Sequence, residues 1–226
     1  MDNDFWHRRW RKNEIGFHQE TGSPHLRSFW QTLGLTRGQP VFVPLCGKSR
    51  DMIWLAQQQH PVLGVELSAV AVADFFREHQ LTPQRMSAGA FEVWETDAIK
   101  LLCGDFFALS AADLENVAGV YDRASLIALP PAMRRDYAKH LLGSLPPGAP
   151  MLLVTLEYPQ ELMQGPPFCV HEQEVRTLYG EHYAVELLKV YDALPESPRF
   201  QDLGLPYFNE KIYCLKPDNL KCDRSG

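Results

Sequence analysis

The stretch from Pro40 to Ser68 constrains the fold of this chain more than any other part of the sequence. An apolar run, a turn at Pro44–Gly47, a helical pattern and a second apolar run ending in Glu66 predict a strand, turn, helix and strand in succession. Gly47 lies roughly 20 residues before Glu66, a spacing at which nucleotide sites pair a glycine turn with a carboxylate for ribose hydroxyls. The full glycine pattern of dinucleotide sites is missing, so the unit indicates a smaller, adenosine-bearing cofactor rather than NAD.

Apolar runs and helical patterns alternate along most of the chain, as in a parallel sheet with crossover helices. Residues 91–95 and 99–103 predict a hairpin, and residues 185–190 and 210–215 predict an antiparallel pair at one sheet edge. Five strand–helix units followed by such a pair predict an open sheet of seven strands. We therefore predict an α/β fold with a seven-stranded, mostly parallel sheet and helices on both faces.

Composition and charge exclude several classes of protein. The 226 residues carry a formal net charge of −6, and nucleic-acid binding needs concentrated Lys and Arg, so we expect no nucleic-acid partner. The five cysteines form neither a disulfide framework nor a C-x-x-C metal pattern, so we expect no metal site and a reducing, cytoplasmic location. No basic start followed by a long apolar run is visible, and we expect neither a signal peptide nor a membrane span.

The Cys-Gly-Lys-Ser tetrad at residues 46–49 resembles the end of a phosphate-binding loop. That loop needs an earlier glycine at the position where this chain has Phe42, and without it little backbone can wrap a triphosphate. In the simplest interpretation Gly47 is only a turn residue and Lys48 a solvated helix start. In the interpretation that we favour, the backbone of residues 44–47 contacts a ligand at the carboxyl ends of the strands.

Three predicted strands end in residues that could contact such a ligand. Glu66 can accept hydrogen bonds from a ribose diol or can face solvent, and we favour the ribose. Asp105 can accept from an adenine amino group while Phe106 covers the base, or the two can form a turn and part of the core. Arg123 can hold an anionic or planar group, or can pair with a structural carboxylate such as Asp122 or Asp105.

An aromatic N-terminal segment precedes the first predicted strand. Trp6 and Trp10 are four residues apart and share one face of a helix. We expect Trp6 to pack this helix onto the sheet. We expect Trp10 and Phe17 to line a ligand pocket, because Gly16 indicates a chain turn between them.

Together these segments resemble the thiopurine S-methyltransferase family. The resemblance runs from FWHRRW and IGFHQ through VFVPLCGKSRDM, LGVELS, CGDFF and YDRASLIALPP to FNEKIYCLK, and so covers nearly the whole chain. It implies a Rossmann-like class I methyltransferase fold in a single domain over residues 1–217, with residues 1–35 as a helical cap over the active site and residues 218–226 as a flexible tail.

The resemblance also implies a cofactor and an acceptor. The cofactor is S-adenosyl-L-methionine, which leaves as S-adenosyl-L-homocysteine. The acceptors are aromatic and heterocyclic thiols such as thiopurines, and in bacterial members also selenium and tellurium compounds, which implies a part in tellurite resistance. The family leads us to expect a monomer.

Single residues take roles from the resemblance as well. Four residues occupy the family's cofactor-binding positions: Trp10, Leu45, Glu66 and Arg123. Phe106, with Phe107 beside it, matches the adenine-side position, and Phe17 matches a substrate-contact aromatic. From their places at the turn and at a strand end we add Gly47 and Asp105 to the cofactor site.

The implied chemistry is in-line displacement at an activated methyl group, in which proximity and alignment supply much of the catalysis. An acidic heteroaromatic thiol needs no dedicated base, so we predict that Arg123 positions the anionic acceptor. His18 and His25 can assist deprotonation or can be spare surface histidines, and we favour the second interpretation. Two alternatives remain. One is a non-catalytic protein that sequesters thiols or chalcogen oxyanions, and the other is a nucleotide-dependent enzyme that uses the Gly-Lys-Ser turn.

Overall fold

The computed structural model describes residues 3–16 and 21–217. The chain divides into two compact units, Met1–Tyr121 with Ser144–Pro146, and Asp122–Gly143 with Pro147–Gly226. The single domain that we predict over residues 1–217 stays a prediction, and the predicted tail at residues 218–226 lies outside the described part of the chain.

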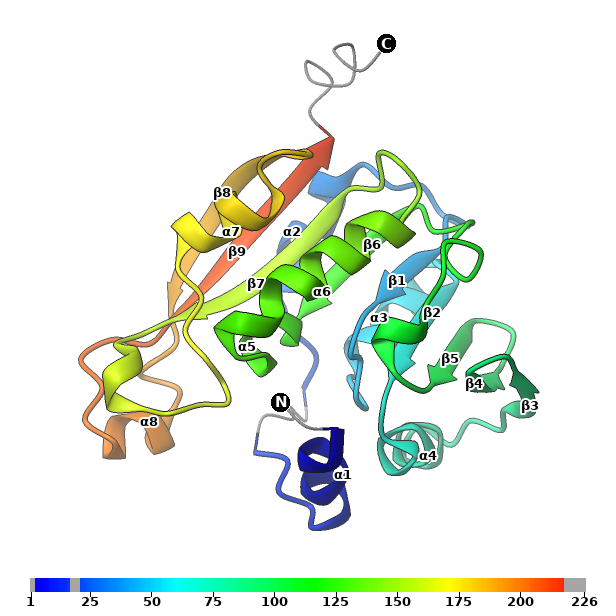
Figure 1. Cartoon of the computed structure of the whole chain (residues 1–226), viewed down its shortest axis with the longest axis horizontal. Helices are drawn as coiled ribbons and strands as arrows, with labels where there is room; N and C mark the ends of the chain where they lie inside the picture. Colours follow the sequence, from blue (N-terminus) through cyan, green and yellow to red (C-terminus); the bar gives the residue numbers. More distant parts are fainter. Residues whose placement is uncertain (1–2, 17–20, 218–226) are drawn as a thin grey trace. The chain divides into compact units, whose positions relative to one another are not determined.

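The first unit is built on parallel strands, which Figure 1 shows in blue to green. Strand β1 pairs in parallel with both β2 and β6, and β2 pairs in parallel with β5. The strand order in this unit is β3-β4-β5-β2-β1-β6. The strands are β1 (Val41–Val43), β2 (Val62–Glu66), β3 (Gln84–Ala88), β4 (Phe91–Glu95), β5 (Ile99–Cys103) and β6 (Gly119–Arg123), the last of which continues into the second unit.

Helices α4 and α2 of the first unit begin at a serine that caps them. Ser68 accepts from the Ala71 N–H ahead of α4, and Ser23 accepts from the Leu26 N–H ahead of α2. Helix α4 packs against β2 and β5, and α1 packs against α4. The helical elements are α1 (Asn3–Arg11), α2 (Pro24–Phe29), η1 (Trp30–Leu33), α3 (Asp51–Gln57), α4 (Ala69–Glu78) and η2 (Phe106–Ala108).

The predicted hairpin is confirmed and is longer than expected. Strand β4 pairs antiparallel with β5 and also with β3, a strand that the sequence did not predict. All five residues of β3 are exposed, so no apolar period marks it. Its Arg85 binds Glu92 and lies 3.8 Å over the ring of Trp94. The described residues contain nine strands, so the predicted number of seven is wrong.

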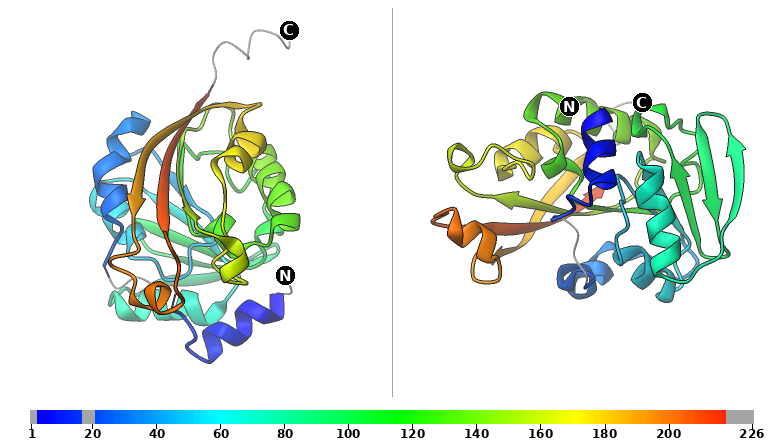
Figure 2. Two further views of the ribbon diagram at one scale, coloured as in Figure 1. Left: turned by 90° about the vertical axis from the view of Figure 1, so that its left-hand side faces the viewer. Right: turned by 90° about the horizontal axis from the view of Figure 1, so that it is seen from below.

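The second unit holds three antiparallel strands. Strand β9 pairs with β7 on one side and with β8 on the other, and Figure 2 shows β8 and β9 running side by side in orange and red. This confirms the antiparallel pair near the C-terminus. The elements are α5 (Ser125–Ala128), α6 (Pro131–Ser144), β7 (Met151–Glu157), η3 (Gln160–Leu162), α7 (Glu172–Tyr179), β8 (Tyr183–Asp192), α8 (Pro198–Asp202) and β9 (Asn209–Pro217).

The second unit contains an apolar cluster that joins the C-terminal end of β7 to residues near the start of β9, including Leu156, Tyr158 and Phe208. Phe208 stacks on Phe200 of α8 with ring centroids 4.1 Å apart, and the ring of Tyr158 lies 5.8 Å from that of Phe208. The sequence did not predict α8, which is one turn long and polar over most of its length. Within the described ranges no helix is both long enough and apolar enough to cross a membrane.

Candidate cofactor site

The turn that follows β1 has a left-handed backbone at two residues. Leu45 and Gly47 have φ of 45° and 52°, and for a residue with a side chain this conformation costs roughly 1–2 kcal/mol. The Cys46 N–H donates to the Val65 carbonyl at 3.0 Å, and the Gly47 N–H donates to Oε2 of Glu66 at 2.9 Å. These bonds hold the turn against the carboxyl end of β2, the edge at which open α/β sheets bind ligands.

Glu66 is the buried carboxylate beneath this turn. Its other oxygen, Oε1, accepts from the Ser68 N–H at 2.8 Å. Burial raises the pKa of Glu66 to about 7, although the backbone N–H groups of Ser68, Gly47 and Leu67 act in the opposite direction. Each carboxylate oxygen can accept two hydrogen bonds, so each keeps capacity for one more donor. The group therefore fits the two neighbouring hydroxyls of a ribose.

Trp10 of α1 covers the turn. Its side chain is buried, and its ring lies 3.2 Å from the place where a Cβ on Gly47 would stand. A side chain at residue 47 would crowd the Trp10 ring and would also strain the left-handed backbone, so glycine suits this position. Trp6 is half-buried and makes an edge contact with Phe5 at 5.2 Å between ring centroids. The structure thus brings Trp10, Gly47 and Glu66 together, as the sequence predicts.

Asp105 and the two phenylalanines follow β5. Asp105 caps η2, because its Oδ1 accepts from the Phe107 N–H at 2.9 Å, and its Oδ2 accepts from Asn3 at 3.4 Å. The turn-forming role that we left open for Asp105 is therefore present. Phe106 is buried, whereas Phe107 is 40% exposed. A role of these residues at an adenine stays a prediction.

The Gly-Lys-Ser segment makes local contacts. Lys48 is buried and binds Glu78 at 2.7 Å, so the interpretation of Lys48 as a solvated helix start is wrong. Ser49 donates its N–H to the Cys46 carbonyl and accepts from the Asp51 N–H. Both side chains that a phosphate loop would use are thus engaged within the turn and its neighbouring helices.

The remaining predicted residues lie elsewhere. Arg123 stands at the carboxyl end of β6 and is half-buried; it belongs to the second unit, whereas the residues of the turn belong to the first. Phe17 and His18 lie outside the described residues. His25, which we expect at the surface, is instead buried in α2.

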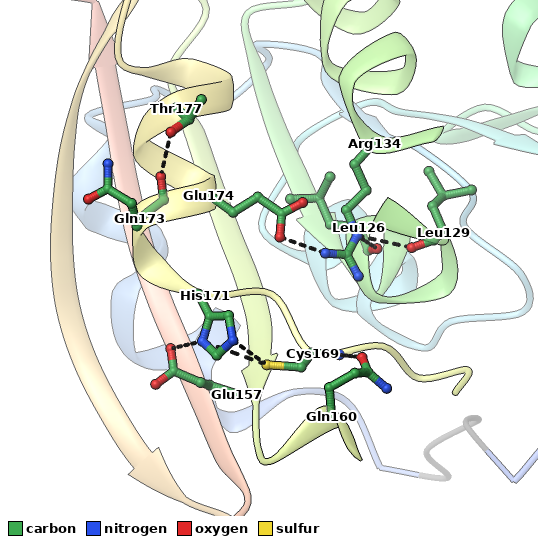
Figure 3. Close-up of polar contacts among 10 residues, drawn as sticks. All are labelled: Leu126, Leu129, Arg134, Glu157, Gln160, Cys169, His171, Gln173, Glu174 and Thr177. Atoms are coloured by element: carbon green, nitrogen blue, oxygen red, sulfur yellow. Dashed lines mark hydrogen bonds and ion pairs between the residues drawn. The ribbon is translucent and has the colours of Figure 1, made fainter. Parts of the chain in front are cut away.

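The second unit contains a buried arginine that the sequence did not single out. Figure 3 shows the guanidinium of Arg134, 1% exposed, bound to three partners. Its Nε donates to the carbonyls of Leu126 and Leu129 at 3.1 and 3.0 Å, and its Nη1 binds Oε2 of Glu174 at 2.6 Å. Arg134 therefore fastens the segment after Arg123 to α6 and α7. Two adjacent arginines in a helix look alike in the sequence, so no local signal could distinguish it.

A cysteine and a histidine also meet in the second unit (Figure 3). Sγ of Cys169 lies 3.6 Å from Nε2 of His171, whose Nδ1 lies 3.6 Å from Oε2 of Glu157. Burial raises the pKa of the Cys169 thiol, which disfavours the thiolate that a nucleophile needs. Among the residues that the structure describes, no group of three or more His, Cys, Asp or Glu is placed to hold a metal ion.

Comparison with known proteins places the chain in a family. The sequence profile described as Thiopurine S-methyltransferase matches residues 1–218. This chain belongs to the thiopurine S-methyltransferase family. A relative of that name from Nitrosospira multiformis is 50% identical over 215 residues, which cover 95% of this chain and 98% of the relative. Another from Azotobacter vinelandii is 51% identical over 216 residues, 96% of this chain and 99% of the relative.

Solved structures agree on the fold. A 1,6-didemethyltoxoflavin-N1-methyltransferase from Burkholderia thailandensis has a TM-score of 0.65 at 15% identity and covers 96% of this chain and 87% of its own. A methyltransferase from Anabaena variabilis, described as S-adenosylmethionine-dependent, has a TM-score of 0.62 at 15% identity, covering 95% and 94%. The α/β class I fold is thereby confirmed. As a member of the thiopurine S-methyltransferase family, the chain is an S-adenosylmethionine-dependent methyltransferase.

Proposed function

We propose that this protein methylates small aromatic and heterocyclic thiols of the thiopurine kind, and also selenium and tellurium compounds, which would give a part in tellurite resistance. The observation that supports a thiol as the acceptor is the 50% identity, across 95% of the chain, to a relative named Thiopurine S-methyltransferase. The selenium and tellurium acceptors rest on the resemblance to bacterial members alone. We propose further that the protein acts as a cytoplasmic monomer with a single catalytic domain, capped by residues 1–35.

The cofactor would lie on the turn at residues 44–47. The backbone at Leu45 and Gly47 would contact its amino-acid end, and Glu66 would accept from its ribose hydroxyls through the capacity that each oxygen retains. Trp10 would close the turn from above. Asp105 and Phe106 would hold the adenine side, with the more exposed Phe107 beside them.

When bound, S-adenosylmethionine supplies a sulfonium-activated methyl group. The residues of the chain then have to orient the acceptor and exclude water, since alignment can account for much of the rate. Arg123 would hold an anionic thiol or selenol by charge-assisted hydrogen bonds and would also contact the cofactor. Phe17 would stack on a flat acceptor. No side chain need remove a proton from an acceptor that is already ionised.

The deciding experiment is incubation of the protein with methyl-labelled S-adenosylmethionine and a panel of thiopurine, aryl thiol, selenol, tellurite and selenite acceptors. We expect label in the thiol products, together with S-adenosylhomocysteine in equal amount. Acceptor binding by calorimetry without transfer would support a sequestering protein instead. Magnesium-dependent ATP binding would support a nucleotide-dependent enzyme. Size-exclusion chromatography with light scattering tests the monomer.

A further inference from the structure

Lys48 follows the cofactor turn directly and is a buried cation. Its side chain is 8% exposed, and its Nζ lies 2.7 Å from Oε1 of Glu78, the last residue of α4. Glu78 is 36% exposed and also lies 3.7 Å from Arg77, which in turn binds Asp74 at 2.6 Å. Among the residues that the structure describes, Glu78 is the carboxylate close to this buried ammonium, and it comes from a different element.

An ion pair of this kind is a weak source of stability. Removing an ammonium from water is costly, and an apolar side chain of similar volume often serves the fold equally well. A charged pair at a nearly buried position has another property: a single short contact fixes the distance between two backbone segments. Here the segments are the turn at residues 44–47 and the C-terminal end of α4.

Helix α4 is tied to the site at both of its ends. At its start, the Ser68 N–H donates to Oε1 of Glu66, and Oε2 of the same carboxylate accepts from Gly47. At its end, Glu78 binds Lys48, the residue after Gly47. Both ends of α4 are therefore linked to the left-handed turn, the start through Glu66 and the end through Lys48. Lys48 and Glu78 are 30 residues apart along the chain.

We propose that the Lys48–Glu78 pair is a positioning device that sets the backbone of the turn for S-adenosylmethionine, so that Lys48 acts on cofactor affinity without touching the cofactor. This inference rests on the proposed role of the turn at residues 44–47. Loss of the pair lets the turn relax from its left-handed conformation, and an error of less than an ångström in a binding backbone is enough to weaken a ligand. The acceptor side of the reaction is left unchanged.

The test is a double-mutant cycle read by calorimetric binding of S-adenosylmethionine and S-adenosylhomocysteine. We expect Lys48→Met and Glu78→Gln each to weaken binding roughly tenfold. The double variant should be no weaker than Lys48→Met alone, because Glu78→Gln acts only by weakening the contact that Lys48→Met already removes. In the methyl-transfer assay the KM for S-adenosylmethionine should rise while the KM for the acceptor and kcat stay close to the wild type.

The matched control is Lys100→Met, which removes a lysine from an exposed pair with Glu95 in the same unit. It should change neither affinity nor melting temperature. Additive effects of Lys48→Met and Glu78→Gln, or wild-type cofactor affinity in a folded Lys48→Met, would overturn the inference. If Lys48→Met does not fold, Glu78→Gln decides alone, because it keeps the shape of the partner and removes its charge.

Comparison of Glu66→Ala with Lys48→Met and Glu78→Gln separates the positioning role of the ion pair from the proposed place of the cofactor. If Glu66→Ala loses cofactor affinity while Lys48→Met and Glu78→Gln keep it, the turn binds the cofactor and the ion pair does not position it. If Glu66→Ala, Lys48→Met and Glu78→Gln all bind as the wild type does, the proposed place of the cofactor is itself wrong.

Discussion

At the scale of single residues, Glu66 has two functions in the proposed site. It organises the turn through Gly47 and Ser68, and it offers its remaining acceptor capacity to a ribose. We expect Glu66→Ala to weaken S-adenosylmethionine binding by roughly 10- to 100-fold, because hydrogen bonds to a charged group contribute about 1.5–3 kcal/mol. Calorimetry measures the effect, with Glu95→Ala as the control, because the Glu95 side chain in the hairpin is 39% exposed. Unchanged affinity would remove Glu66 from the ribose.

The role proposed for Arg123 predicts an effect on turnover of the acceptor. Arg123→Ala should lower kcat/KM for an anionic thiol by roughly 100-fold, as the loss of a positioned charge does in other enzymes, while the fold stays intact. Steady-state kinetics and a melting curve measure both quantities. The control is Arg135→Ala, an exposed arginine in α6 of the same unit. Wild-type kcat/KM in a folded Arg123→Ala would contradict the proposed role.

Gly47 allows backbone strain to be separated from steric contact. Gly47 and Gly34 both have positive φ, 52° and 71°, but a Cβ on Gly47 would stand 3.2 Å from the Trp10 ring, whereas a Cβ on Gly34 would meet nothing within 4 Å. Both alanine variants should lose about 1 kcal/mol of unfolding free energy from strain. Only Gly47→Ala should also weaken S-adenosylmethionine binding. Equal binding by the two variants would show that the Trp10 contact has no part in it.

At the scale of the elements, Arg134 joins α5, α6 and α7. It is bound to two carbonyls near α5 and to Glu174, so its loss leaves these groups without their partner inside the protein. Removing one member of a buried pair costs about 3–5 kcal/mol, and we expect Arg134→Met to lower the free energy of unfolding by about that amount. Urea unfolding followed by circular dichroism measures it.

The control for this prediction is Arg176→Ala. Arg176 pairs near the surface with Glu172 one turn away on α7 and also donates to the Val185 carbonyl at 2.9 Å. An exposed pair contributes about 0–1 kcal/mol and a hydrogen bond about 0.5–1.5 kcal/mol, so we expect a smaller loss than in Arg134→Met. Equal losses in Arg134→Met and Arg176→Ala would mean that burial of Arg134 has no energetic consequence. The contrast also tests whether the segment after Arg123 depends on α7.

Among the strands, some were predictable from apolar patterns in the sequence and one was not. Strands β2 and β5 were predictable because buried parallel strands are continuous apolar runs. Strand β3 was not, since an edge strand with five exposed side chains has no apolar period, and pairing with β4 is what makes it a strand. The antiparallel pair of β8 and β9 was predictable in place, but each strand extends further at both ends than the predicted residues 185–190 and 210–215.

At the scale of the whole molecule, two buried carboxyl groups affect how stability depends on pH. Burial raises the pKa of Glu66 from 4.5 to about 7 and that of Asp122 from 3.8 to about 6. The folded protein then holds protons that the unfolded chain releases. The contribution of these two groups to the free energy of unfolding therefore falls as pH rises through these windows, about 4.5 to 7 for Glu66 and about 3.8 to 6 for Asp122.

The corresponding variants separate the two groups. Glu66→Gln should remove the fall in stability between pH 4.5 and 7 relative to the wild type, and Asp122→Asn should remove the fall between pH 3.8 and 6. Melting temperatures across pH 4 to 8 measure both. Curves for variant and wild type that stay parallel through these windows would contradict the raised pKa values.

The sequence alone determined the α/β class, the turn after the first strand and the pairing of Gly47 with Glu66. These features depend on periodicity and spacing within one strand–turn–helix–strand unit, which the order of residues encodes directly. The tertiary structure alone decided that Lys48 and Phe106 are buried while Phe107 is exposed. It also decided that the buried Arg134 binds Leu126, Leu129 and Glu174. The partners of Lys48 and Arg134 stand 30 and 40 residues away along the chain. Burial and ion pairing depend on what the fold packs against a side chain, and no local pattern contains that information.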